Sequence, residues 1–210
     1  PRVMGLDIYR DLKQGTVVEQ QKLEDFFRTT PNIIGVEKAI DEKVKPSPTL
    51  KEIGQVAMAD FVLDADGKAR RALMLIGYDD GDVGFSLGTL TALMYLEQDG
   101  ILLEDGAEAN EKLLGKAKLT ALKSNSAAYI DADAAGFQTL INYRGREDSF
   151  VHTSMTDVLQ NEIPADIFRD RVVLIGATAP SLNDFFYTPY SSRSQSSQRM
   201  PGVYVHANIA

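Results

Sequence analysis

The side chains best suited to chemistry lie near the carboxyl end of the chain. Asp184 and His206 could act as orienter and base, with Ser181 or Thr188 as nucleophile, which is the side-chain set of a hydrolase or transferase. Such triads have no fixed spacing in sequence, so a soluble α/β hydrolase is one alternative. Structural roles compete with it, because a histidine at a helix terminus often bonds to the preceding loop and an aspartate often caps amides of its own loop.

No established catalytic or metal-binding motif accompanies these residues. The chain contains no P-loop, GxGxxG, GxSxG, HExxH or CxxC, and GATAP at Gly176–Pro180 lacks the glycines of a dinucleotide turn. The two histidines, His152 and His206, are fifty-four residues apart, and no local spacing of carboxylates completes a metal site. We therefore expect no metal and no cofactor, and we interpret His152 as structural.

Composition excludes further classes of function. The chain of 210 residues is 44% hydrophobic, which is ample for a packed core, and its formal charge is -8. This negative charge argues against a nucleic-acid partner and against docking on anionic lipid through a basic patch. Cysteine is absent, which excludes disulfides and thiolate nucleophiles, and no apolar run reaches the roughly eighteen residues that a membrane span needs.

One acidic stretch resembles the start of a calcium-binding loop. Asp64-Ala-Asp-Gly67 has the opening pattern, but Leu75 stands at the twelfth position, where such a loop needs a glutamate. Between the apolar runs Val56–Leu63 and Ala69–Ile76, the same stretch predicts the turn of a β-hairpin. The two arginines after the turn could bind an anionic ligand, but in an acidic chain arginines more often pair with carboxylates.

The candidate residues near the carboxyl end follow the most strand-like run in the chain. Val172 to Ile175 are four consecutive apolar residues, which predicts a strand covered on both faces and ended by Gly176. The small and polar residues Ala177–Asp184 predict a loop that leaves the carboxyl end of a sheet. Because ligands bind at that edge in open α/β folds, this loop is the first place to look for function.

A βαβ unit is predicted at the start of the chain. Val3–Tyr9 and Asn32–Val36 are apolar strands, and Glu19–Arg28 between them has helical spacing. Adjacent parallel strands joined by a helix are the natural arrangement of such a unit. Asp7 would then lie near the carboxyl end of its strand, on the same edge as the loop.

The remaining segments complete one α/β domain. We expect a helix at Ser86–Gln98, capped by Ser86, with a core stripe of Leu87, Leu90, Leu93 and Met94. In the middle of the chain we expect a turn at Asp79–Asp82, short helix and loop at 101–125, and strands at Tyr129–Asp131 and Phe137–Tyr143. Towards the carboxyl end we expect a helix at Thr153–Gln160, a turn at Pro164–Phe168 and a flexible segment at Ser191–Gln198. The last predicted element is a helix from Tyr204, with His206 and Asn208 in its first turn. The predicted fold class is α/β, a single domain with a mixed, largely parallel sheet flanked by helices and an inserted β-hairpin.

Several of these pieces together resemble the carboxyl-terminal signature of the CHASE family, type two. They are RVVLIGATAPSLND, the pair Thr188-Pro189 and the closing PGVYVHANIA, with GLDIYRD, ADFVLDADGKARRA and INYRG agreeing upstream. The family consists of extracellular sensory domains associated with cyclases and histidine kinases. The resemblance implies that residues 1–210 are most of one such domain, without the family's first strand and helix and with its last helix cut.

The resemblance implies a non-catalytic sensor on the extracytoplasmic, periplasmic side of a bacterial inner membrane. Family members follow a transmembrane helix and precede further helices and a cyclase or kinase, so we expect membrane tethering by segments outside this chain, and a homodimer. An unknown small molecule at the sheet edge would shift the carboxyl-terminal helix. The candidate ligand-binding residues are Asp7, Thr178, Asp184, Thr188, His206 and Asn208, with Arg71 and Asn142 as outer candidates. A structural spacer or protein-interaction module is the third alternative.

Overall fold

Four parallel strands form the central sheet of the computed structural model, which describes residues 1–40, 42–78, 81–191 and 199–210. The strands follow the order β11-β1-β2-β3, with bounds Val3–Asp7 (β1), Ile33–Glu37 (β2), Val56–Met58 (β3) and Val172–Gly176 (β11). Asp7 pairs with Gly176 in the register of β1 and β11, so the two strands end level with each other. The expected flexible segment at Ser191–Gln198 lies outside the described residues except for Ser191. The expected turn at Asp79–Asp82 lies partly outside them.

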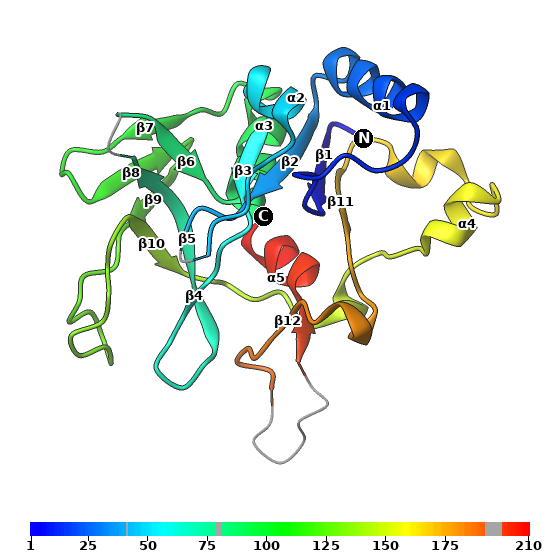
Figure 1. Cartoon of the computed structure of the whole chain (residues 1–210). Coiled ribbons are helices and arrows are strands. Elements are labelled where there is room, and N and C mark those ends of the chain that lie inside the picture. Colours follow the sequence, from blue (N-terminus) through cyan, green and yellow to red (C-terminus); the bar gives the residue numbers. More distant parts are fainter. Residues whose placement is uncertain (41, 79–80, 192–198) are drawn as a thin grey trace.

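Helices cover both faces of this sheet (Figure 1). Ile33 of β2 packs with Phe27 and Leu50, whereas Ile34, its neighbour in the strand, packs with Leu87 on the opposite face. Successive strand residues point to opposite faces, so one face carries α1 and α2 and the other carries α3. The helix bounds are Val17–Thr29 (α1), Pro48–Glu52 (α2), Leu87–Glu97 (α3), Met155–Leu159 (α4) and Gly202–Ile209 (α5), with short 3₁₀ turns at Glu147–Ser149, Ala165–Phe168 and Pro180–Leu182.

Local sequence explains where the two longest helices begin. Thr16 and Glu19 form a capping box at the start of α1, which confirms the expected helix there. Ser86 is the N-cap residue of α3, as expected, but its hydroxyl pairs with that of Thr89 at 2.8 Å and makes no capping bond to a backbone amide of the helix. The expected stripe packs in the core through Leu87, Leu90 and Met94.

The other strands are antiparallel. They are β4 (Val62–Leu63), β5 (Ala69–Gly77), β6 (Val83–Phe85) and β10 (Phe137–Leu140) in one sheet, β7 (Leu103–Asp105), β8 (Glu111–Leu114) and β9 (Ala117–Thr120) in a second, and the pair β12 (Phe185–Phe186) and β13 (Met200–Pro201). The predicted α/β class, with a parallel sheet flanked by helices and an antiparallel hairpin, is confirmed. The hairpin turn contains Gly67 at φ +75°.

Three predicted elements differ from the structure. The expected strand at Val56–Leu63 divides into β3 of the parallel sheet and β4 of the hairpin, with Ala59–Phe61 between them. The expected helix and loop at 101–125 are instead the three strands β7, β8 and β9, and Gly115 at φ +57° forms the turn between the last two. Residues Tyr129–Asp131 form no strand: the amide of Tyr129 bonds back to the carbonyl oxygen of Ser126, and Ile130 and Asp131 form a bend.

The strand that was expected to be buried on both faces is the edge strand β11. Its side chains are only partly buried, and Ile175 is 43% exposed. A continuous apolar run suits an edge strand as well as a central one, and the other three strands of this sheet, β1, β2 and β3, contain buried residues whereas β11 contains none. Helix α5 packs against β11 and α3 (Figure 1), and because it begins at Gly202, His206 and Asn208 lie in its second turn and not its first.

Candidate functional site

The carboxyl edge of the parallel sheet meets helix α5 at one narrow contact. Asp7 is the last residue of β1, and its register partner Gly176 is the last residue of β11. A Cβ on Gly176 would lie 2.7 Å from the Cβ of Val203 on α5 and 3.2 Å from the Cβ of Asp7. Only glycine lets the helix approach the strand this closely, so residue 176 sets the position of α5 over Asp7.

His206 of α5 and Asp7 face each other in the interior. The Nε2 atom of His206 lies 3.9 Å from Oδ1 of Asp7, and the two side chains are 1% and 9% exposed. Among the described residues, neither ring nitrogen of His206 nor Oδ2 of Asp7 has a hydrogen-bond partner. The ring of Phe61 packs on the imidazole with centroids 4.4 Å apart. The structural interpretation of His206 required a hydrogen bond to the preceding loop, and the imidazole makes no such bond among the described residues.

Burial moves both groups toward their neutral forms. Desolvation raises the pKa of Asp7 to about 7, and the negative charge of Asp184 adds to the increase. Desolvation lowers the pKa of His206 to about 3. Between pH about 3 and about 7 the pair therefore holds one proton, on Asp7, and Asp7 becomes a buried carboxylate only near neutral pH.

Asp184 completes the acidic side of the site. Burial raises the pKa of its carboxyl group, and the backbone N–H of Gly202, which faces it, opposes the increase. Gly202 is the first residue of α5, and a Cβ there would lie 2.5 Å from Oδ2 of Asp184. The carboxylate thus lies at the amino-terminal end of α5, where the helix dipole favours negative charge. The interpretation of Asp184 as a cap of its own loop is replaced by contact with the helix.

Tyr9 and Asp60 belong to the same edge, and sequence reasoning missed both. Burial, with the charges of Asp60, Asp7 and Asp184, raises the pKa of Tyr9 to about 12. Asp60 is buried and accepts hydrogen bonds from the amides of Ala39 and Ile40 at 2.8 and 3.1 Å. Asp60 lies just beyond the carboxyl end of the parallel strand β3, and Asp7 is the last residue of β1, so the shared edge is the signal that could have found it.

Asn208 has a structural role in the described residues. Its Oδ1 accepts hydrogen bonds from the amides of Arg144 and Gly145 at 2.8 and 3.4 Å. Its Nδ2 donates to the carbonyl groups of Tyr204 and Gly145 at 2.8 and 3.3 Å. The amide therefore ties α5 to the loop after β10 and retains little capacity for a ligand.

The two threonine candidates are not brought to Asp7 by any described contact. Thr188 is buried in a turn, where its Oγ1 accepts from the amide of Tyr190 and its own amide donates to Oγ of Ser191. Thr178 is exposed on the loop after β11. The outer candidate Asn142 is exposed as well.

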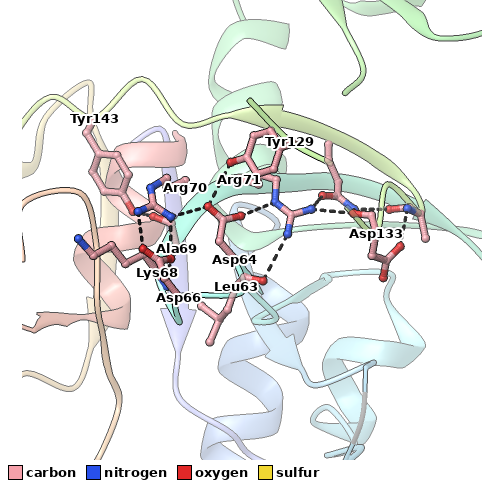
Figure 2. A network of polar contacts seen from close by, with 12 residues as sticks. Leu63, Asp64, Asp66, Lys68, Ala69, Arg70, Arg71, Tyr129, Asp133 and Tyr143 are labelled. Carbon is pink, nitrogen blue, oxygen red and sulfur yellow. Dashed lines mark hydrogen bonds and ion pairs between the residues drawn. The ribbon is translucent and has the colours of Figure 1, made fainter. Parts of the chain in front are cut away.

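Arg71, the other outer candidate, is occupied inside the protein. Its guanidinium donates to Oδ1 of Asp64 at 2.8 Å, to Oε1 of Gln138 at 2.9 Å and to the carbonyl oxygen of Asp133 at 2.6 Å (Figure 2). The neighbouring Arg70 forms ion pairs with Asp64 and Asp66, so both carboxylates of the turn between β4 and β5 are paired with arginine side chains. This network fixes the β4–β5 hairpin and leaves no free group for an anion.

The geometry of a hydrolytic triad is not formed. Ser181 is exposed whereas His206 is buried, and no described hydroxyl bonds to the imidazole. A base must come within hydrogen-bond reach of its nucleophile, and among the described residues no hydroxyl meets this condition for His206. Across the same residues, no group of three or more His, Asp or Glu side chains is placed to hold a metal ion.

Comparison with known proteins identifies one family. The family model of the CHASE2 domain matches residues 1–210, which is the whole chain. No curated protein and no solved structure matches it. Within the described ranges, none of the helices has the length and apolar character that a membrane crossing requires.

Proposed function

The chain belongs to the CHASE2 domain family, whose members are extracellular sensory domains, and we propose that it senses a small molecule outside the cytoplasm and transmits the signal through α5. Residues 1–210 act as one sensory unit of a bacterial transmembrane protein that segments outside this chain tether to the inner membrane. The output is a cyclase or a kinase, and the sensor itself is non-catalytic. Because such outputs act as dimers, the sensor works as a homodimer in the whole protein.

One observation carries the proposal: three polar atoms of the buried pair Asp7 and His206, between the sheet edge and α5, have no hydrogen-bond partner among the described residues. A buried polar atom without a hydrogen bond costs about 1–3 kcal/mol. A ligand that forms hydrogen bonds with these atoms removes the cost of leaving them unpartnered. It does so only for the position of α5 in which the atoms face the ligand. The ligand therefore shifts α5 by its differential affinity for the two positions.

The packing of α5 supports its role as the moving element. Gly88 of α3 lies so close to the helix that a Cβ would be 2.6 Å from the carbonyl oxygen of His206. At its far end, Asn208 bonds to the loop at Arg144 and Gly145. A displacement at His206 is thus passed to α3 and to the loop after β10, since both contact the same short helix.

A thermal-shift screen of a diverse small-molecule panel on the purified chain tests the proposal. A sensor ligand raises the melting temperature of the wild type in a saturable manner, because it binds the folded state alone. The increase should be lost in Asp7→Asn and retained in Asn142→Ala, whose side chain is exposed. Compounds that stabilise both variants equally, or a panel without any saturable compound, would contradict a ligand site at Asp7 and favour a spacer or interaction module.

A further inference from the structure

Among the residues that the structure describes, the carboxylates at the sheet edge form no ion pair with a lysine or an arginine. Within the described part of the chain, Asp7, Asp60 and Asp184 form no ion pair with a lysine or arginine. Asp64 and Asp66, by contrast, are both held by arginines. Arg10 is three residues after Asp7, yet its Nε atom is buried and has no partner among the described residues, and the pKa of Asp7 is shifted by burial and by Asp184. In the described part of the chain, no ion pair with a lysine or arginine therefore balances the negative charge of the edge.

Between Asp7 and His206, two of the three polar atoms that have no partner among the described residues are acceptors. A carboxylate accepts only, and a neutral imidazole offers one acceptor and one donor. Oδ2 of Asp7 and both ring nitrogens of His206 have no partner in the described residues, although the His206 side chain is only 1% exposed and its Nε2 is directed at Asp7. The group that complements these atoms carries a positive charge and donates several hydrogen bonds.

Two observations select an organic cation over a metal ion. No set of three or more His, Asp or Glu side chains in the described residues could hold a metal. Aromatic side chains also lie beside these residues, because Phe61 packs on His206 and its ring lies 4.6 Å from that of Phe186. Aromatic faces attract organic cations and pack against their carbon atoms. A hydrated metal ion has no carbon atoms that could make this contact.

We infer that Asp7, Asp184 and His206 bind the protonated amine of a small organic ammonium compound. The ammonium group donates to the carboxylates of Asp7 and Asp184 and to the ring nitrogen of His206 that bears no proton. This inference rests on the proposed sensory function, for which it names the class of ligand.

Ammonium binding competes with the proton on Asp7. The groups around that carboxyl are Asp184, which raises its pKa, the neutral His206, and Tyr9 with Asp60 further along the edge. Below a pH of about 7 the cation must displace this proton, because a protonated carboxyl cannot neutralise it. The affinity for the ammonium group should therefore fall about tenfold for each pH unit below neutrality.

Calorimetric titration with butylammonium chloride tests the inference, with sodium butyrate and sodium chloride at equal ionic strength as controls. We expect saturable binding of butylammonium alone, a loss of at least tenfold in Asp7→Asn, and no change in Asp66→Asn, whose carboxylate pairs with Arg70. The binding should weaken from pH 7 to pH 6 in the wild type. Far-ultraviolet circular dichroism confirms that each variant is folded before titration.

The outcomes separate the ligand class from the function. Equal heats for butylammonium and sodium chloride, or equal binding by the wild type and Asp7→Asn, overturn the ammonium inference. If a neutral or anionic compound from the broader panel then binds in a manner that depends on Asp7, the sensory function stands and only the class is wrong. Binding of butylammonium that strengthens as the pH falls also overturns the inference, because the proton would then not compete.

Discussion

Gly176 at the end of β11 lies directly against Val203 of α5, with room for a hydrogen atom and not for a methyl group. A Cβ at residue 176 would be 2.7 Å from the Cβ of Val203, closer than carbon atoms of real side chains approach. The two residues join the sheet edge to the helix that we propose carries the signal. Because the side chain of residue 176 is only a hydrogen atom, α5 can lie this close to β11, and a larger side chain would force the helix to move.

Gly176→Ala should displace α5 and destabilise the protein by about 1–3 kcal/mol, because Val203 is attached to a packed helix and cannot move alone. Urea unfolding measures the change. Gly77→Ala is the matched control, since a Cβ at residue 77 at the end of β5 meets no atom within 4 Å. If both variants lose the same stability, the close contact at Gly176 does not constrain the helix.

Asp7 and His206 should compensate each other in the dependence of stability on pH. Between pH about 4 and about 6.5, the folded pair binds one proton on Asp7, and the unfolded chain binds one proton on His206. Equal proton numbers in the two states make the free energy of unfolding independent of pH as far as this pair contributes. In a variant that lacks one of the two residues, the free energy of unfolding should therefore depend on pH through the residue that remains.

Asp7→Asn should make stability rise with pH relative to the wild type. The raised pKa of Asp7 gives a stabilisation that is complete below its unfolded pKa and is lost as pH rises through about 7. Without this loss, the difference in unfolding free energy between variant and wild type increases by about 1.4 kcal/mol per pH unit between pH about 4 and about 7. Urea unfolding at several pH values measures it. A flat difference would mean that Asp7 titrates as an exposed carboxyl does.

His206→Leu should produce the opposite slope. The lowered pKa of His206 gives a stability that is present above its unfolded pKa of about 6.5 and is lost as pH falls toward about 3. Removing the imidazole leaves the Asp7 contribution alone, so the variant loses about 1.4 kcal/mol per pH unit relative to the wild type as pH rises from about 4 to about 6.5. His152→Leu is the control, because His152 is exposed. Similar slopes in both histidine variants would refute the buried pair.

Sequence reasoning located the edge of the sheet but not the contact across it. Asp7 was predictable because the carboxyl ends of parallel strands meet at one edge, and His206 because it follows the loop from that edge. Their pairing depends on Gly88 and Gly176, which admit α5 between α3 and β11. Those approaches join residues distant in sequence, and no local pattern of hydrophobicity encodes them.

The errors in the predicted elements have local and non-local causes. The hairpin of β8 and β9 carried a readable signal, because Gly115-Lys116 between Leu114 and Ala117 fits a two-residue turn. The edge position of β11 carried none, since an apolar run does not reveal its neighbours. The hydrogen bonds of Asn208 carried none either, because its partners at Arg144 and Gly145 lie far away in sequence.

Asn208→Ala should destabilise the protein by about 2–4 kcal/mol while leaving ligand binding at Asp7 intact. The variant removes the bonds that hold the amides of Arg144 and Gly145, and that of Gly145 is buried. Urea unfolding gives the loss, and hydrogen exchange at the Gly145 amide should accelerate. Asn142→Ala, on the exposed side of the same loop, should change stability by less than about 0.5 kcal/mol. A stable Asn208→Ala that no longer responds to ligands would instead make Asn208 a binding residue.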